Sequence, residues 1–272
     1  MAILNATPDS FSDGGHLQRD LDGRIRALVA AGADVLDVGG ESTRPGHTPV
    51  TADEELARVL PVLAACRRLA PQVPVSIDTR KAAVAREALA AGAVLVNDVT
   101  GLDDPAMAGV VRATGCGVVL MRHRDLRPLH ADRGHNGTAS AGSAVSVDWT
   151  VEACQAELAS IVARARAAGI PAGAIALDPG LGFGDPPGGD PAANWALLRG
   201  VASYAQGFPV LVGASRKRFV AQGEPVAARR IAQSVDAAVQ AVQAGARIVR
   251  VHDVAETVAA LSRLGPATSQ MP

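Results

Sequence analysis

The sequence predicts an α/β protein folded as a single-domain (β/α)8 barrel of the TIM type. Eight short apolar runs alternate with longer helix-like stretches along the chain. Nearly every run ends in a residue that can form hydrogen bonds or carry charge, and a barrel of this kind gathers such residues from the carboxyl ends of its parallel strands into one active site. The chain has 272 residues, and the fold typically takes about 250.

The expected strands are short and apolar on both faces, as buried parallel strands must be. They lie near 2–5, 34–38, 74–78, 93–97, 117–121, 174–178, 209–213 and 247–251. The expected helices lie near 19–31, 51–70, 80–91, 105–114, 149–168, 192–204, 216–244 (with a break at Pro225) and 255–264. Such alternation implies parallel strands joined by right-handed crossovers. A doubly wound open sheet is the alternative.

Glycines mark the ends of the expected helices. Ala-Gly-Ala triplets at 31–33, 91–93 and 244–246 each stand between an alanine-rich stretch and an apolar run, and Gly115 and Gly169 occupy similar places. Glycine just after a helix readily takes the left-handed conformation that ends it. The triplets therefore predict where each helix turns into the next strand.

Two stretches interrupt this rhythm. Residues 123–148 are rich in Arg, His, Gly and Ser, and residues 185–191 consist of turn-forming types. Both follow strands, so we expect both on the catalytic side of the barrel. The barrel domain is expected to span 1–266, with a frayed tail at 267–272.

The composition limits the classes of partner. A formal net charge of −1 argues against broad electrostatic binding to nucleic acid or to acidic membranes. The cysteines, Cys66, Cys116 and Cys154, lack metal-ligand spacing and indicate buried free thiols in a reducing cytoplasm. No apolar stretch is long enough to span a bilayer, and the first five residues are expected to form a strand rather than a signal peptide.

Asp78, Asn97 and Asp178 end the third, fourth and sixth expected strands, and Lys217 follows the seventh. Two acids, one amide and one lysine match a flat heterocycle with several donors and acceptors. Each aspartate could instead cap a helix, but helix capping does not account for the whole set. The pattern therefore predicts a polar small-molecule site.

The last two expected strands predict an anion pocket. Residues 215–218, Ser-Arg-Lys-Arg, lead from the seventh strand into the expected helix, whose first amide groups would suit an anion. Strand alternation places Arg250 and His252 on one face, and both side chains can bind phosphate. The loops after the seventh and eighth strands form a recurrent phosphate site in barrels.

Three further loops follow strands at the same end. The first, at 5–15, is long for such a connection and contains one aromatic residue, Phe11. The second, at 39–46, combines three glycines and a proline with Arg44, which offers a planar cationic fork. The third, at 178–184, has glycines that let the backbone approach a ligand closely. Long loops on this face are usually functional.

Taken in order, these segments resemble the dihydropteroate synthases, enzymes of folate biosynthesis. The matching segments are 3–15, 37–46 (Asp-Val-Gly-Gly-Glu-Ser-Thr-Arg-Pro-Gly), 76–79, 97–98, 177–180, 182–184, 215–217 and 250–253. The resemblance implies an enzyme that condenses 6-hydroxymethyl-7,8-dihydropterin diphosphate with 4-aminobenzoate to give 7,8-dihydropteroate and diphosphate. It also implies a cytoplasmic homodimer that is a sulfonamide target, with neither nucleic acid nor membrane as a partner.

The resemblance also implies roles for individual residues. The pterin would be held by Asp78, Asn97, Met121, Asp178, Gly213 and Lys217. The diphosphate would be held by Asn5, Arg250 and His252, with Mg²⁺ as cofactor at Asn5. The 4-aminobenzoate pocket would be shaped by Thr43, Arg44, Pro45, Phe183, Ser215 and Lys217. The catalytic set would be Lys217, Asp78, Arg250 and His252.

This chain departs from the family pattern in places. Asp185 stands where the family commonly has lysine, and in Met121-Arg122-His123 the histidine is displaced by one position. Two rival functions remain, namely a pterin-dependent methyltransferase and a non-catalytic pterin-binding paralogue. The first would not need Lys217, and the second should have lost the anion-binding residues.

Overall fold

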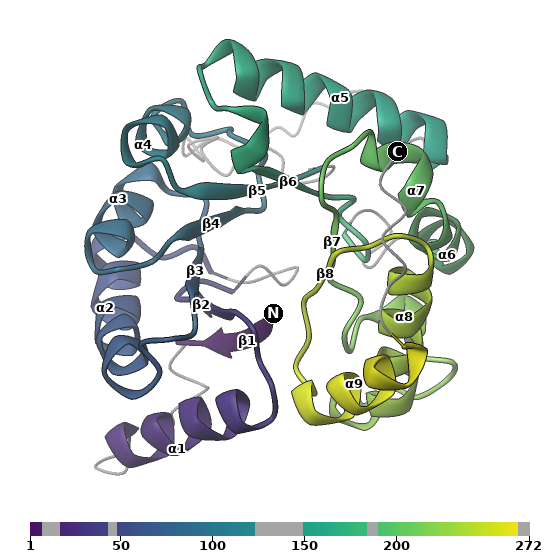
Figure 1. Cartoon of the computed structure of the whole chain (residues 1–272), viewed down its shortest axis with the longest axis horizontal. Helices are drawn as coiled ribbons and strands as arrows, with labels where there is room; N and C mark the ends of the chain where they lie inside the picture. The colour runs from purple at the N-terminus through teal and green to yellow at the C-terminus, as the bar shows by residue number, and fades with distance from the viewer. Residues whose placement is uncertain (7–16, 43–47, 123–148, 184–189, 266–272) are drawn as a thin grey trace, which may run out of the picture.

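The computed structural model is a closed barrel of eight parallel strands inside a ring of helices, which confirms the predicted fold class (Figure 1). The structure describes residues 1–6, 17–42, 48–122, 149–183 and 190–265. The expected tail at 267–272 and most of the two interrupting stretches lie outside these ranges. The strands are β1 Ala2–Asn5, β2 Leu36–Gly39, β3 Val75–Asp78, β4 Leu95–Asp98, β5 Gly117–Met121, β6 Ile175–Asp178, β7 Leu211–Val212 and β8 Ile248–Val249.

The barrel closes through two isolated bridges. Strands β1 to β6 form one parallel sheet in sequence order, and β7 pairs with β8 in a second sheet. The bridge Leu177↔Val210 joins β6 to the segment before β7, and Ala2↔Val251 joins β1 to the segment after β8. An open doubly wound sheet has no such closure, so that alternative is wrong.

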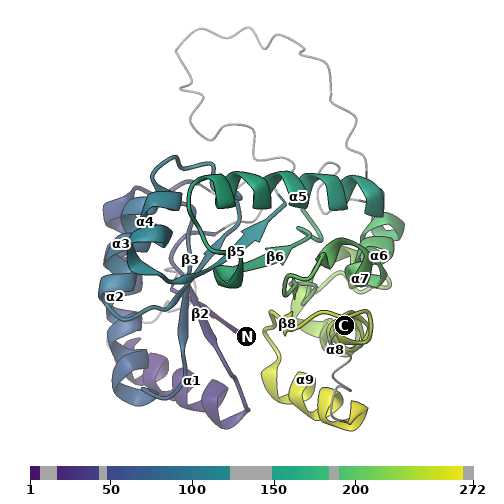
Figure 2. The ribbon, with the colours of Figure 1, turned by 45° about the horizontal axis from the view of Figure 1, so that its top comes forward.

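The helices form the outer layer around the strands (Figures 1 and 2). They are α1 Leu17–Ala30, α2 Ala52–Leu69, α3 Ala82–Ala90, α4 Met107–Thr114, α5 Val151–Ala167, α6 Pro191–Arg199, α7 Val201–Ala205, α8 Ile231–Gln243 and α9 Val254–Leu261. Short 3-10 turns are η2 Ala172–Ala174, η3 Arg218–Val220, η4 Ala227–Arg229 and η5 Ser262–Leu264. The predicted glycine helix ends are confirmed, because Gly32, Gly92, Gly115, Gly169 and Gly245 all have positive φ.

Three expected helices differ from the prediction. The one expected from 216 begins only at Ile231, because positive φ at Gln222 and Gly223 and then Pro225 interrupt a helical path. The one expected over 192–204 is divided at Gly200, where a Cβ atom would come within 2.7 Å of Val151 on α5. The one expected from 105 begins at Met107.

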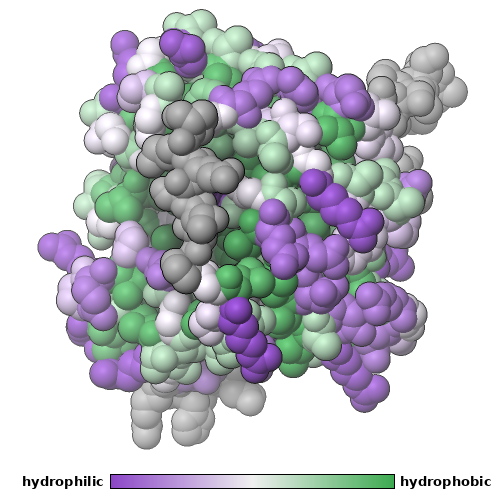
Figure 3. Space-filling model, turned by 45° about the vertical axis from the view of Figure 1, so that its right-hand side comes forward, coloured by the Kyte–Doolittle hydropathy of each residue, from purple (hydrophilic) through white to green (hydrophobic). Residues whose placement is uncertain are grey.

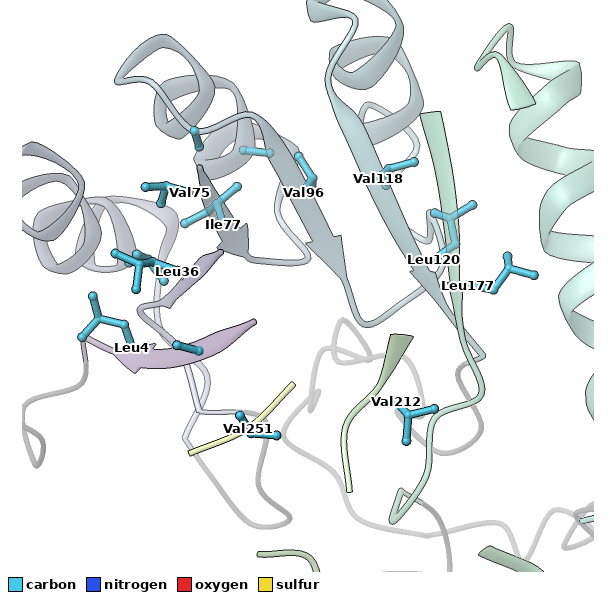
Figure 4. Packing of buried hydrophobic residues seen from close by; sticks show 14 of the residues in the cluster. Leu4, Leu36, Val75, Ile77, Val96, Val118, Leu120, Leu177, Val212 and Val251 are labelled. Carbon is cyan, nitrogen blue, oxygen red and sulfur yellow. The ribbon is translucent and has the colours of Figure 1, made fainter. Parts of the chain in front are cut away.

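Strand alternation separates two apolar cores. Residues such as Leu36, Ile77 and Leu177 belong to the larger cluster, which also contains helix residues and so lies between strands and helices (Figure 4). The second cluster fills the lower lumen of the barrel with Met1, Val119, Ala176 and Leu211, beside partly buried Val35, Leu95 and Ile248. The lumen is therefore a packed interior rather than a pore.

The surface and the cysteines agree with a globular barrel. The face turned forward in Figure 3 mixes hydrophilic and hydrophobic residues. Within the described ranges, no helix combines the length and the apolarity that crossing a membrane requires. Cys66, Cys116 and Cys154 are free and buried, as predicted.

A partly buried ion-pair network ties the ends of β2 and β3 together. Glu41 accepts hydrogen bonds from Arg80 at 3.0 Å and from Lys81 at 2.6 Å, and Lys81 also contacts Glu55 at 2.5 Å. Burial alone would raise the pKa of Glu41, but the bonds from Arg80 and Lys81 outweigh it and lower that pKa to about 2. The charged form of Glu41 therefore stabilises the fold.

Glu41→Gln should lower the free energy of unfolding by about 2–4 kcal/mol at neutral pH. Because the folded pKa is depressed, this stabilisation is present above the ordinary value of 4.5 and is lost as the pH falls toward 2. Urea unfolding of both proteins at pH 7 and pH 3 measures the difference. The exposed Glu87→Gln on α3 is the control. An equal difference at both pH values would contradict the assignment.

Candidate active site

The predicted strand-end residues lie side by side on neighbouring strands of the barrel. Asn5 pairs with Gly39, Gly39 with Asp78, and Asp78 with Asn97 across β1 to β4. On the other side, Met121 of β5 pairs with Asp178 of β6. Parallel strands place their carboxyl ends at one edge, so these side chains share the mouth of the barrel.

Arg250, which follows β8, is ion-paired inside this mouth. Its Nε donates to Asp37 Oδ2 and its Nη2 to Asp78 Oδ2, each at 2.6 Å. Burial works against the charge of Arg250, but Asp37 and Asp78 nevertheless raise its pKa. Gly213 lies beside it, since a Cβ atom there would be 3.9 Å from the Arg250 Cβ. The guanidinium is therefore a fixed positive charge between two acids.

Asp37 is a site residue to which the sequence analysis assigned no role. It is fully buried in the middle of β2, and its Oδ2 also accepts from Asn97 Nδ2 at 3.3 Å. Asp37 Oδ1 and Asn97 Oδ1 are buried without a hydrogen-bond partner among the described residues. The signal was available, because an acid two residues before the strand end has the same facing as the residue at the end.

The two strand-end acids have altered titration. Burial raises the pKa of Asp78, and Arg250 opposes this effect while Asp37 adds to it. Burial also raises the pKa of Asp178, opposed by Lys217 and by the N–H of Gly180, which donates to Asp178 Oδ1 at 2.8 Å. Both carboxylates are therefore costly to keep charged and suited to ligands that bring N–H donors.

Lys217 lies against the loop that leaves β6. Its ammonium donates to the carbonyl of Leu181 and sits 4.2 Å from the centre of the Phe183 ring, a cation–π contact. Its stem covers Gly182, where a Cβ atom would come within 2.5 Å of Lys217 Cδ. Burial lowers the pKa of Lys217 to about 8, partly opposed by Asp178. The predicted Phe183 and Lys217 are thus brought together.

Asn194 on α6 holds this loop in place and was not predicted. It is fully buried, its Oδ1 accepts from the N–H of Gly182 at 2.6 Å, and its Nδ2 donates to the carbonyl of Asp190 at 2.9 Å. Gly180 and Gly182 both have positive φ, so the loop follows a path that glycine favours. Sequence offered no signal, because an asparagine on a helix is usually exposed.

The predicted anion pocket is only partly as expected. Ser215 and His252 lie together, with Ser215 Oγ 3.0 Å from His252 Nδ1. The predicted helix N-terminus at 215–218 is wrong, since only the turn η3 follows Lys217. Arg216 pairs instead with Asp253, and Arg230 donates to the carbonyl of Arg216. These contacts fix the 216–230 segment without an α-helix.

Arg122 occupies the place where the family commonly has histidine. Met121 faces the mouth with Asp178, and alternation turns the buried Arg122 toward the helices. There its Nε contacts Glu157 of α5 at 2.6 Å and its guanidinium lies 6.0 Å from the Trp149 ring. The substitution thus serves the strand–helix contact.

Some predicted residues lie outside the described part of the chain. These are Phe11 and the 4-aminobenzoate residues Thr43, Arg44 and Pro45. The described residues contain no group of three or more His, Cys, Asp and Glu side chains that could hold a metal ion. The one predicted metal-binding residue that they include is Asn5, partly buried at the end of β1.

The chain matches a protein-family model described as pterin binding enzyme over residues 1–252. It is 44% identical over 266 residues to a probable bifunctional folylpolyglutamate synthase/dihydropteroate synthase of Haloferax volcanii, with 96% of this chain and 30% of the relative covered. It thus spans about a third of the length of the first curated relatives it matches. It is 42% identical to a dihydropteroate synthase of Mycobacterium leprae, covering 97% of this chain and 92% of the relative.

Solved structures give the same likeness. A Xanthomonas albilineans dihydropteroate synthase with 4-aminobenzoic acid superposes with a TM-score of 0.83 at 39% identity, covering 100% of this chain and 93% of that one. A Burkholderia cenocepacia dihydropteroate synthase complexed with 7,8-dihydropteroate superposes with a TM-score of 0.80 at 41% identity, covering 97% and 89%. The fold therefore has close counterparts among solved dihydropteroate synthases.

The lowered pKa of Lys217 can be measured directly, because the chain has only two lysines, Lys81 and Lys217. In protein labelled with ¹³C-lysine, one Cε resonance should titrate with a midpoint near 8, since burial disfavours the charged ammonium. That resonance should be missing in Lys217→Arg and kept in Lys81→Arg. A midpoint near the ordinary 10.5 would show that the ammonium is hydrated.

Proposed function

Because this chain belongs to the pterin-binding enzyme family, we propose that it is a dihydropteroate synthase. It condenses 6-hydroxymethyl-7,8-dihydropterin diphosphate with 4-aminobenzoate and releases 7,8-dihydropteroate and diphosphate. The observation that carries the proposal is the joint presence at one barrel mouth of acceptors for a pterin, namely Asp78, Asn97 and Asp178, and of cations for an anion and an aromatic ring, namely Arg250 and Lys217.

The pterin half of the site follows from its acceptors. A pterin presents an amino group and adjacent ring N–H groups on one edge, and a carboxylate such as Asp178 can accept from two of them. Asn97 Oδ1, buried and without a partner among the described residues, offers a further acceptor. Met121 on β5 is almost fully buried and forms an apolar wall beside these groups. Gly213 has no side chain and leaves space next to them.

The residues proposed to bind the diphosphate lie at the end of β1 and just after β8. Arg250 and His252 follow β8, and Asn5 ends β1, whose Ile3 N–H bonds to the carbonyl of Val251 at 3.0 Å. Mg²⁺ takes six oxygens and usually keeps waters and substrate phosphate oxygens around one or two protein groups. The single amide oxygen of Asn5 on the neighbouring strand fits an ion that arrives with the diphosphate. When bound, Mg²⁺ would neutralise the leaving charge.

The chemistry needs charge stabilisation more than proton transfer. The C–O bond to diphosphate breaks with its electron pair leaving on the oxygen, while Arg250 and His252 neutralise the anion. Asp78 and Asp178 stabilise the electron-poor carbon that is conjugated to the pterin. The aniline nitrogen of 4-aminobenzoate is neutral near pH 7, attacks that carbon and then loses one proton. A strong general base is not required.

The 4-aminobenzoate pocket would be built around Phe183, Ser215 and Lys217 on the described side. Thr43, Arg44 and Pro45 complete it in this proposal, on the family resemblance alone. Sulfonamides, which share the aniline end of this substrate, would compete for the same place. A cytoplasmic homodimer is likewise expected from the family resemblance.

The rival functions fit the mouth less well. A pterin-dependent methyltransferase would not need Lys217 against the Phe183 ring, and a non-catalytic pterin-binding paralogue would not need Arg250 or His252. The arrangement therefore favours a transferase that expels diphosphate.

The proposed activity predicts diphosphate release from the pterin substrate that depends on 4-aminobenzoate and Mg²⁺. A coupled diphosphate assay and chromatography of 7,8-dihydropteroate should give equal amounts of both products. Release without 4-aminobenzoate at the same rate would favour a hydrolase instead.

Lys217→Ala should keep the fold and lose turnover by orders of magnitude, because Lys217 would contact both substrates in this proposal.

Asp178→Asn should weaken binding of the unphosphorylated hydroxymethyl pterin by about 2–4 kcal/mol, because an amide donor would face ligand N–H groups and leave one unpaired. Calorimetry measures the loss, with the exposed Asp236→Asn on α8 as the control. Affinity within twofold of the original protein would remove Asp178 from the pterin site.

A further inference from the structure

Asp37 lies one layer deeper in the barrel than the acids that meet the ligand. Its register partner on β3 is Ser76, whereas Asp78 pairs with Gly39 two residues further along β2. Asp37 is fully buried, while the side chain of Asp78 keeps 11% of its exposure. A ligand entering the mouth therefore reaches Asp78 before Asp37.

Arg250 connects these two layers through different nitrogens. Its Nε points to Asp37 below, and its Nη2 points to Asp78 above, both at 2.6 Å. Asp37 also receives a longer bond from Asn97 on the same oxygen, at 3.3 Å. One guanidinium thus serves two carboxylates, which leaves one negative charge in excess within this trio.

The two acids differ in what can replace Arg250. The N–H groups of a pterin can take the place of Arg250 at Asp78, because that carboxylate is open to the mouth. No ligand can do the same at Asp37 without entering the apolar lumen below. A buried charge that loses its partner is strongly destabilising, so the Asp37–Arg250 pair is the one that must persist.

We propose that Asp37 is a positioning residue that keeps the charge of Arg250 compensated while Asp78 exchanges Arg250 for the pterin as its hydrogen-bond partner. In the empty site, Arg250 holds both acids. When the pterin binds, Asp78 turns to the ring N–H groups, and Arg250 stays on Asp37 through Nε. The freed Nη2 is then available to the diphosphate. This inference rests on the proposed function and assigns a role to a residue outside the predicted set.

In Asp37→Asn, Asp78 is the acid that still accepts a hydrogen bond from Arg250, so a pterin that takes Asp78 leaves the guanidinium without an ion-pair partner. A pterin diphosphate restores that charge with its own anion, whereas an unphosphorylated pterin does not. Hydroxymethyl pterin should therefore bind about tenfold more weakly or worse, and the diphosphate ester with Mg²⁺ should lose about threefold or less.

Calorimetry of both ligands with the original protein and with Asp37→Asn tests whether the two affinity losses differ in this way. Asp98→Asn is the matched control, since Asp98 is a buried acid on β4 whose partners are Thr100 and Leu102 rather than Arg250. It should lower stability and leave the ratio of the two affinities unchanged. Equal losses for both ligands in Asp37→Asn, or no loss for either, would overturn the proposal.

A second measurement needs no pterin. The Nε–H resonance of Arg250, identified by its absence in a folded Arg250→Lys protein, should remain protected from exchange with water when Mg²⁺ and inorganic diphosphate are added to saturation to the original protein. Loss of that protection would show that the pair with Asp37 breaks, and would overturn the inference. Failure of the original protein to bind any pterin would instead count against the proposed function.

Discussion

The compensation of charge inside the barrel mouth is the constraint on which the site depends. Among the described residues, three acids share the mouth with two cations, and burial shields all of them from water. The acids are Asp37, Asp78 and Asp178, and the cations are Arg250 and Lys217. Leaving any of these charges unpaired would cost several kcal/mol. In the empty site Arg250 is ion-paired with Asp37 and Asp78, and a ligand must replace each contact that it removes.

The barrel register makes this set possible. Parallel pairing in sequence order brings Asn5, Asp78 and Asn97 into one row although they lie far apart along the chain. The apolar plug of Met1, Val119, Ala176 and Leu211 beneath them removes water from the floor. The low polarity of that floor strengthens every interaction above it. Arg250 reaches across from β8 because the bridge between Ala2 and Val251 closes the ring.

Residues at strand ends could be predicted from the sequence, because the end of an apolar run is visible in the chain and all such ends meet at one edge. Asp78, Asn97 and Asp178 were found in this way. Asn194 lacked that signal, since it lies on a helix. Asp37 lies two residues before the end of its strand and faces the same way, but its partner Arg250 is far away in sequence. The expected break at Pro225 lies within a segment that is not α-helical, but the helix expected on its N-terminal side from 216 is wrong, because Arg230 and the turn at Gly223 fix a different path. Propensity yields where tertiary contacts decide.

Contacts from two sides hold the loop after β6 in place. Gly182 is held from one side by Asn194 on α6 and covered on the other by the stem of Lys217. Any side chain at Gly182 would displace Lys217, and any loss at Asn194 would free the loop that carries Phe183. The ring and the ammonium are thus positioned by a helix that does not itself face the mouth. In this barrel, the outer layer sets the geometry around Phe183 and Lys217, while the strands set the charge of the mouth.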